Sequence, residues 1–176
     1  MVLRVFLIGF MGCGKTTLGR LLATRLDWQW IDLDKYIEQR HCRTIDWLLM
    51  QLGEAKFREI EHAALVEVSD FENVVISCGG GTPCFFDNMQ LMCSQGRTIY
   101  LQVEPSVLVE RLKNASVQRP LITCSNSIDL QQQVEQLLIR RESFYTKADM
   151  VVQGDDEDKE RIVQRMIDEL HKIQPS

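Results

Sequence analysis

The stretch that decides the fold is Gly9-Phe10-Met11-Gly12-Cys13-Gly14-Lys15-Thr16, which matches the pattern GxxxxGK[ST] at every fixed position. Glycines at these positions let backbone N–H groups approach phosphate oxygens without a Cβ in the way. The lysine of such a motif reaches the β- and γ-phosphates of a nucleotide, and the hydroxyl that follows it binds Mg²⁺. The motif therefore predicts a phosphate-binding loop.

The residues on either side of this loop have the periodicity that it requires. Residues 2–8 form a short, apolar, β-branched run that is typical of a buried parallel strand. After Lys15 the period becomes helical, with Leu18, Leu22 and Leu26 on one face. The alternative is a glycine-rich turn that matches the motif by chance. A strand before the loop and a helix after it argue against that alternative.

Apolar runs and helical patterns alternate along the rest of the chain. Further strands are expected at 28–33, 73–77, 98–103 and 150–152, and helices at 36–39, 45–52, 54–69, 87–96, from 105, at 128–147 and at 157–173. Gly53 is expected to end the helix before it. This alternation predicts an α/β fold with a parallel sheet covered on both faces. The 176 residues fit a single domain, 1–176.

Charge and hydropathy exclude several classes of partner. The net charge of −5 lacks the basic face that nucleic-acid binding requires. No run approaches the ~20 apolar residues that span a bilayer, and the apolar stretch 5–10 is too short for a signal peptide. We expect a cytoplasmic protein without a nucleic-acid or membrane partner. The six cysteines form no CxxC pair, so we expect packed, reduced thiols, with one reactive thiol as the alternative.

Two acidic residues, Asp32 and Asp34, flank Leu33 at the end of the expected strand 28–33. Alternation along a strand would place both carboxylates on one side, at the ligand-facing edge of the sheet. One could belong to the Mg²⁺ shell while the other accepts a hydrogen bond from a substrate hydroxyl. A solvated turn or a helix cap is the alternative.

Glycines and arginines complete the set of candidate residues. Three consecutive glycines, 79–81, follow an expected buried strand and indicate a close approach of the backbone to a ligand, or otherwise a tight turn. Arg58 precedes Glu61 by three positions, so a surface ion pair is the alternative to a binding role. Arg119 lies in segment 114–127, which lacks periodicity and is expected to be a mobile loop. Arg140 and Arg141 are adjacent on a helix and face different directions.

Read together, these residues resemble shikimate kinase over most of the chain. The matching pieces, in order, are GFMGCGKTTLGR at 9–20, DLD at 32–34, GEAKFREIE at 53–61, VISCGGGT at 75–82, RPL at 119–121 and RRESFYTKA at 140–148. The resemblance implies a three-layer P-loop kinase fold with a five-stranded parallel sheet and a mobile lid at about 114–127. It also implies transfer of the γ-phosphoryl group of ATP to the 3-hydroxyl of shikimate, a step of chorismate and aromatic amino acid biosynthesis.

The resemblance also assigns roles to residues. Those implied to contact ATP are Gly12, Cys13, Gly14, Lys15, Thr16, Thr17 and Arg119. Those implied to bind shikimate are Asp34, Arg58, Gly79, Gly80, Gly81 and Arg141. Thr16 and Asp32 would hold Mg²⁺, and the catalytic residues would be Lys15, Asp34 and Arg119. Arg141 is chosen over Arg140 because the family's substrate arginine lies four residues before a tyrosine, here Tyr145. Glu61 would orient Arg58.

Two rival functions have different signatures. A kinase for gluconate or a nucleoside monophosphate would share the phosphate loop, and the triple glycine and the Arg58/Arg141 pair favour a carboxylated polyol over a nucleotide base. A regulatory module that binds nucleotide without turnover would not need Lys15, Thr16, Asp34 and Arg119 together. We therefore expect a monomeric enzyme whose partners are ATP and shikimate.

Overall fold

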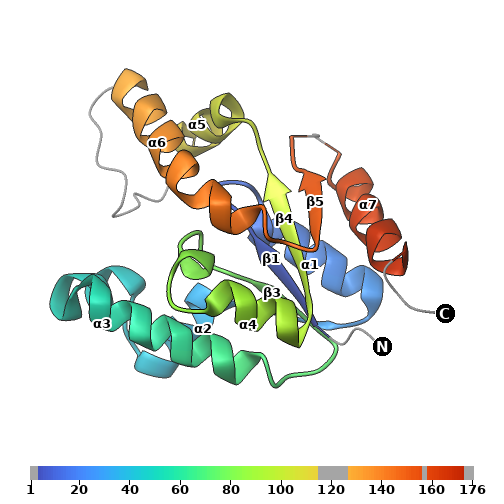
Figure 1. Ribbon diagram of the computed structural model, residues 1–176, viewed down its shortest axis with the longest axis horizontal. Coiled ribbons are helices and arrows are strands. Elements are labelled where there is room, and N and C mark those ends of the chain that lie inside the picture. The colour runs from blue at the N-terminus through green and yellow to red at the C-terminus, as the bar shows by residue number, and fades with distance from the viewer. Residues whose placement is uncertain (1–3, 115–126, 156–157, 173–176) are drawn as a thin grey trace.

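The computed structural model describes residues 4–114, 127–155 and 158–172, and its centre is a five-stranded parallel sheet (Figure 1). The strands are β1 (Arg4–Ile8), β2 (Gln29–Asp32), β3 (Val74–Ser77), β4 (Arg97–Gln102) and β5 (Met150–Gln153). They lie in the order β2-β3-β1-β4-β5, and every neighbouring pair is parallel. The chain runs from β1 to β2 on one side of the sheet and from β3 to β4 on the other, so the order switches between β1 and β3, and ligands bind such sheets beyond the carboxyl ends of the strands at that point.

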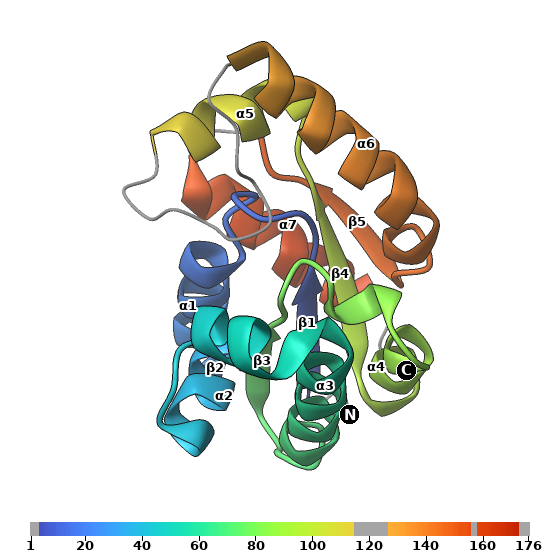
Figure 2. The ribbon, with the colours of Figure 1, turned by 90° about the vertical axis from the view of Figure 1, so that its left-hand side faces the viewer.

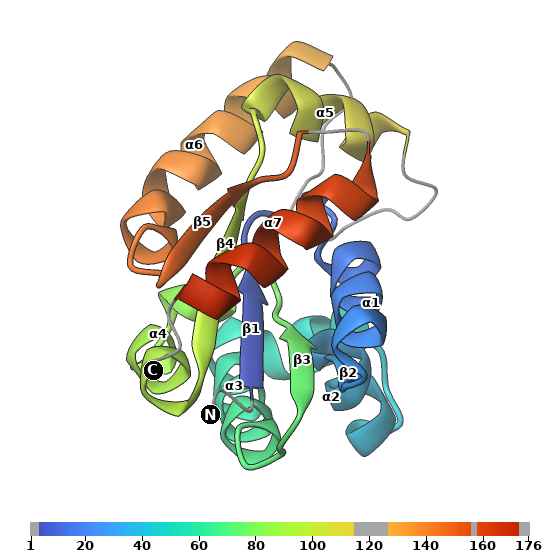
Figure 3. The same ribbon diagram turned by 90° about the vertical axis from the view of Figure 1, so that its right-hand side faces the viewer.

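Helices cover both faces of the sheet, which confirms the three-layer α/β prediction. They are α1 (Lys15–Leu26), α2 (Leu33–His41), α3 (Ile45–Val68), α4 (Asn88–Gln95), α5 (Pro105–Lys113), α6 (Ser127–Tyr145) and α7 (Lys159–Lys172), with a 3₁₀ turn, η1 (Thr82–Cys84). Figure 3 shows α1 and α7 across one face. Figure 2 shows α3 and α4 in front of the other. In the part of the chain that the structure describes, no helix is both long and apolar enough to cross a membrane.

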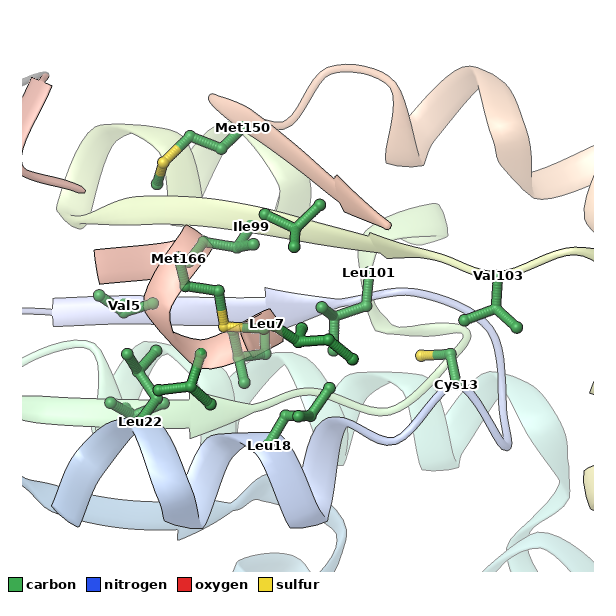
Figure 4. Close-up of a cluster of buried hydrophobic side chains, with 14 of the residues drawn as sticks. Val5, Leu7, Cys13, Leu18, Leu22, Ile99, Leu101, Val103, Met150 and Met166 are labelled. Atoms are coloured by element: carbon green, nitrogen blue, oxygen red, sulfur yellow. The ribbon is translucent and has the colours of Figure 1, made fainter. Parts of the chain in front are cut away.

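Alternation along β1 explains why this strand is apolar throughout. Val5 and Leu7 face α1 and α7, where they pack with Leu22 and Met166 (Figure 4). Phe6 and Ile8 belong to the cluster on the opposite face, together with side chains of α2, α3 and α4. Because both faces are buried, neither set of positions can be polar.

Gly53 divides α3 into two helical segments. Its φ of 77° and ψ of 165° are not helical, so the predicted end of the helix at this residue is confirmed. A left-handed φ favours glycine because a Cβ would strain the backbone there. The next segment starts at once, without the loop that usually separates two helices.

Two sequence expectations need correction, and a third falls almost entirely outside the described residues. Strand β2 ends at Asp32 and α2 begins at Leu33, so the predicted strand 28–33 is too long and the predicted helix 36–39 is too short. Asp34 therefore lies on a helix, not on a strand. The expected lid, including Arg119, lies outside the described residues except for Asn114 and Ser127 at its ends.

Candidate active site

A polar cavity of about 250 Å³ lies at the carboxyl ends of β1, β2 and β3. Its lining residues are Met11, Gly12, Gly14, Lys15, Thr16, Thr17, Asp32, Asp34, Ser77, Cys78, Gly79 and Gly80. Segments far apart in the sequence thus meet where the sheet order predicts a ligand site.

The phosphate loop follows β1 and starts α1. Gly12 and Gly14 have φ values of 83° and 101°, which only glycine adopts without strain. Lys15 Nζ donates to the carbonyl oxygens of Gly9 at 2.9 Å and Phe10 at 2.8 Å. The ammonium group is therefore held against the loop at the N-terminus of α1, where the helix dipole adds positive potential.

Cys13 differs from its neighbours in the loop. Its side chain is fully buried in the core beside Leu101 and Val103 (Figure 4). Its backbone N–H donates to the carbonyl of Phe10 at 3.2 Å. Cys13 is the one predicted ATP contact among residues 12–17 that does not line the cavity.

Asp32 is both a helix cap and a partner of the phosphate loop. Its Oδ1 accepts from the backbone N–H of Lys35 at 3.2 Å, which caps α2. Its Oδ2 accepts from Thr16 Oγ1 at 2.9 Å. The alternative prediction of a helix cap is thus confirmed for Asp32, and the carboxylate that caps α2 also lines the cavity.

This pair of oxygen ligands suits Mg²⁺. The ion prefers hard oxygens and is typically held by one or two protein groups together with phosphate oxygens and water. Within the described residues, no three His, Cys, Asp or Glu side chains form an all-protein metal cluster. The hydroxyl of Thr16 beside the carboxylate of Asp32 therefore fits a metal whose other ligands come from a nucleotide.

Asp34 lies in the first turn of α2 and also lines the cavity. Asp32 and Asp34 both line the cavity, as predicted, but the predicted reason was wrong. They do not alternate along one strand; the turn from β2 into α2 brings both carboxylates to the cavity. Burial, together with the nearby charges of Asp32 and Glu61, raises the pKa of Asp34 from 3.8 to about 6, against a smaller opposing effect of Lys15. Near neutral pH the group is ionised, with a proton affinity raised toward that of a general base.

The glycine triplet allows close packing of charged side chains. A Cβ on Gly79 would lie 2.9 Å from Asp34 Oδ1, and one on Gly81 would lie 2.9 Å from both terminal nitrogens of Arg58. A Cβ on Gly80 would lie 3.3 Å from Arg141 Nη1. The segment also turns tightly, with the N–H of Thr82 bonded to the carbonyl of Gly79. The tight turn is thus confirmed, and the approach of a ligand to the triplet stays a prediction.

Arg58 is buried, so the alternative of a surface ion pair with Glu61 is wrong. The two side chains are 7% and 2% exposed, and Nη1 donates to Glu61 Oε2 at 2.8 Å. Glu61 also accepts from the hydroxyl of Thr82 at 2.6 Å. On another side, the ring of Phe85 lies 4.0 Å from the guanidinium carbon of Arg58. Such fixation restricts the guanidinium to one orientation.

Arg141 is buried and the adjacent Arg140 is exposed, which agrees with the choice made from the spacing to Tyr145. Among the described residues, Arg141 Nη1 is buried without a hydrogen-bond partner. Tyr145 is fully buried, and its hydroxyl donates to the carbonyl of Gly80. The C-terminal end of α6 is thereby fixed to the glycine loop, and Arg141 lies next to it.

Three further residues of this region have no assigned role in the sequence analysis. Glu54 contacts Arg58 Nη2, and its spacing of four positions on a helix is a signal that could have found it. Tyr145 served there only as a spacing marker. Phe85 carried no signal, because its contact with Arg58 depends on the turn after η1. Arg119 lies outside the described residues, so its predicted role stays a prediction.

The arrangement combines a phosphate site with an anion site. Lys15, the loop and Asp34 line the cavity, whereas Arg58 and Arg141 are not among its lining residues and lie close to Gly81 and Gly80 of the adjoining triplet. Transfer of a phosphoryl group from nucleotide to hydroxyl is the chemistry that this order of groups supports.

Comparison with known proteins agrees with this geometry. The family model described as shikimate kinase matches residues 11–171. A shikimate kinase from Phocaeicola vulgatus is 46% identical over 169 residues, which cover 96% of this chain and 97% of the relative. The crystal structure of shikimate kinase from Bacteroides thetaiotaomicron has a TM-score of 0.93 at 44% identity and covers 97% of this chain and 99% of that chain. Shikimate kinase from Acinetobacter baumannii in complex with shikimate has a TM-score of 0.89 at 27% identity, with 100% and 97% covered. The chain belongs to the shikimate kinase family.

Proposed function

We propose that the protein transfers the γ-phosphoryl group of ATP to the 3-hydroxyl of shikimate, giving shikimate 3-phosphate and ADP in the biosynthesis of chorismate and aromatic amino acids. The observation that carries this proposal is the placement of buried Arg58 and Arg141 against the glycine triplet, beside the cavity that holds the phosphate loop and Asp34. Arg58 is paired with Glu61, but among the described residues Nη1 of Arg141 is buried without a hydrogen-bond partner, and such a guanidinium group is costly unless an anion pairs with it. The carboxylate of shikimate supplies that anion.

The residues of the chain would act mainly by position and charge. Lys15 would bind the β- and γ-phosphates, and Asp34 would accept a hydrogen bond from the attacking hydroxyl, which turns an oxygen lone pair toward the γ-phosphorus. The proton of that hydroxyl would pass to Asp34 or leave with the product. Both routes are open because a loose transition state does not require a base to remove the proton early. Arg119 is proposed to close over the phosphates, as the family resemblance implies.

Thr16 and Asp32 would hold Mg²⁺, whose chemistry is the neutralisation of charge on the nucleotide phosphates. Gly12, Gly14 and Thr17 also line the cavity, and their main-chain N–H groups would contact those phosphates. Gly79, Gly80 and Gly81 would let the substrate ring approach the backbone beside Asp34.

Steady ADP production that depends on shikimate tests this function directly. Gluconate, nucleoside monophosphates and shikimate methyl ester serve as alternative acceptors. We expect turnover with shikimate and at least about a 30-fold lower kcat/KM with the ester, since the ester offers no carboxylate to the buried Nη1 of Arg141. Turnover that is independent of shikimate, or equal with gluconate, would contradict the proposal.

We also propose that residues 1–176 act as one domain and one monomer in the cytoplasm, without a nucleic-acid or membrane partner. The net charge of −5 supports the part that concerns nucleic acid. Size-exclusion chromatography with light scattering tests the monomer, and a dimer mass would contradict it.

A further inference from the structure

Arg58 contacts two carboxylates that differ in exposure. Its Nη1 donates to Glu61 Oε2 at 2.8 Å, and its Nη2 donates to Glu54 Oε1 at 3.0 Å. The Glu61 side chain is 2% exposed, whereas that of Glu54 is 57% exposed. Glu61 has a second partner in the hydroxyl of Thr82. Across the described residues, Arg58 Nη2 is the one side-chain hydrogen-bond partner of Glu54. The carboxylate of Glu61 is therefore held in place by two partners, whereas that of Glu54 has one partner and can separate from Arg58.

The backbone at Glu54 gives this side chain room. Glu54 follows Gly53, whose φ of 77° breaks α3. A Cβ built on Gly53 has no atom within 4 Å, so this break is open to its surroundings. Glu54 itself is exposed and lies at the start of the second helical segment. Its carboxylate can therefore move away from Arg58 without disturbing a packed side chain.

We propose that Glu54 is an internal competitor for the substrate carboxylate. In the free enzyme Glu54 occupies Nη2 of Arg58, and the carboxylate of the incoming substrate takes over this donor while Glu61 stays in place. The proposal rests on the proposed function, because that function supplies the carboxylate. It makes Glu54 a specificity-determining residue that does not itself bind the substrate.

The exchange has a physical advantage for selectivity. A buried guanidinium nitrogen without a partner attracts any small anion that reaches it. Glu61 compensates the charge of Arg58 throughout, and Glu54 in addition occupies Nη2 until a ligand offers a better-placed carboxylate. A neutral analogue cannot displace Glu54, so it gains nothing from Arg58. The cost of this arrangement is a weaker apparent affinity for the true substrate.

The simpler alternative predicts a change of opposite sign. A glutamate four residues before an arginine stabilises a helix, and Glu54 would then only help to orient Arg58. Removal of its charge should in that case leave the affinity for shikimate unchanged or weaken it. If Glu54 competes with the substrate, removal of its charge should strengthen binding.

Glu54→Gln is the variant that separates these alternatives, because the amide keeps the size of the side chain and removes its charge. The matched control is Glu59→Gln on the same helix, where the exposed glutamate pairs with Lys56 and does not contact Arg58. Shikimate Kd by titration calorimetry, and KM and kcat by ADP release, are measured for wild type and both variants. Shikimate methyl ester is the uncharged probe.

We expect Kd and KM for shikimate to fall about two- to fivefold in Glu54→Gln, since a half-exposed ion pair is weak. Binding of the ester should not change, and Glu59→Gln should behave as wild type with both ligands. An unchanged or higher Kd for shikimate in Glu54→Gln would overturn the competition. An equal gain for the ester would overturn it as well, because the gain would then not depend on the carboxylate. Absence of shikimate-dependent turnover in wild type would instead overturn the proposed function.

Discussion

The centroid of the Phe85 ring lies 4.0 Å from the guanidinium carbon of Arg58. The next residue, Phe86, has a φ of 50° and turns its ring to His62, with ring centroids 5.2 Å apart. A bulky residue in this left-handed conformation is strained by about 1–2 kcal/mol. The strained turn sends two consecutive rings to different partners. Phe85 is thereby available to hold the plane of the buried arginine.

Phe85→Leu is expected to raise KM for shikimate about three- to tenfold, with kcat changed less. A leucine fills the space but loses a cation–π contact, which is worth ~1 kcal/mol or more when partly buried. Phe85→Tyr should restore the wild-type KM because it keeps the ring. Phe86→Leu is the control, since this exposed ring contacts His62 and not Arg58. An equal rise of KM in both leucine variants would mean that the turn, not the ring, matters.

The adjacent arginines of α6 give a matched pair for a second test. Arg141→Lys is expected to lower kcat/KM for shikimate about 10- to 100-fold, because an ammonium group lacks the planar fork that pairs with two carboxylate oxygens. Arg140→Lys, with the same chemical change on the exposed neighbour, should have almost no effect. KM for ATP should stay constant in both. Similar losses in the two variants would remove Arg141 from the carboxylate site.

Asp34→Asn is expected to abolish turnover and yet to stabilise the fold. The folded protein holds the pKa of Asp34 at about 6, above the value of 3.8 for a free side chain, so ionisation of this group opposes folding. The penalty is absent below about pH 4, grows as the pH rises through the folded-state pKa and is constant above it. The shift corresponds to at most about 3 kcal/mol.

Urea unfolding at pH 4 and pH 8 checks this sign. Asp34→Asn should be more stable than wild type by about 1–3 kcal/mol at pH 8, and the difference should vanish near pH 4. Asp70→Asn, a change at an exposed site, serves as the control. A variant that is less stable than wild type at pH 8 would mean that the carboxylate of Asp34 is needed for folding.

Lys15→Met is expected to lower kcat by at least about 100-fold while the protein remains folded, because the lost charge acts on the phosphates during transfer. The bonds of Lys15 Nζ to Gly9 and Phe10 are also lost, which we expect to cost about 2–3 kcal/mol of stability. A thermal melt run beside the kinetic assay separates the two effects. Near-wild-type kcat in the folded variant would contradict the assignment of the phosphate loop.

Local patterns predicted the sheet well because its strands are buried on both faces. The apolar run before Gly9 and the glycines after β3 identify strand ends without any tertiary information. Local patterns gave a wrong prediction at Leu33, because an apolar residue directly after β2 suggests that the strand continues. The helix there starts because Asp32 caps it, and a cap and a metal ligand look alike in sequence.

The burial of the charged groups could not be predicted from local sequence patterns. Arg58 and Glu61 have the spacing of an ordinary surface pair, and contacts from another part of the chain, among them Thr82 and Phe85, make the pair an interior one. Glu54 and Glu61 likewise look equivalent around Arg58 until their exposure is known. Residue spacing gives neighbours on one helix, but it does not show which neighbours a distant loop covers.

The thiol of Cys13, sealed behind the phosphate loop, provides a built-in probe of how often that loop opens. A thiol reagent reaches this side chain only in an opened state, so its modification rate measures the free energy of local opening. The exposed Cys42 reacts without opening and serves as the reference in the same molecule. Peptide mass spectrometry follows both sites at once. A nucleotide that closes the loop should slow the modification of Cys13 and leave that of Cys42 unchanged.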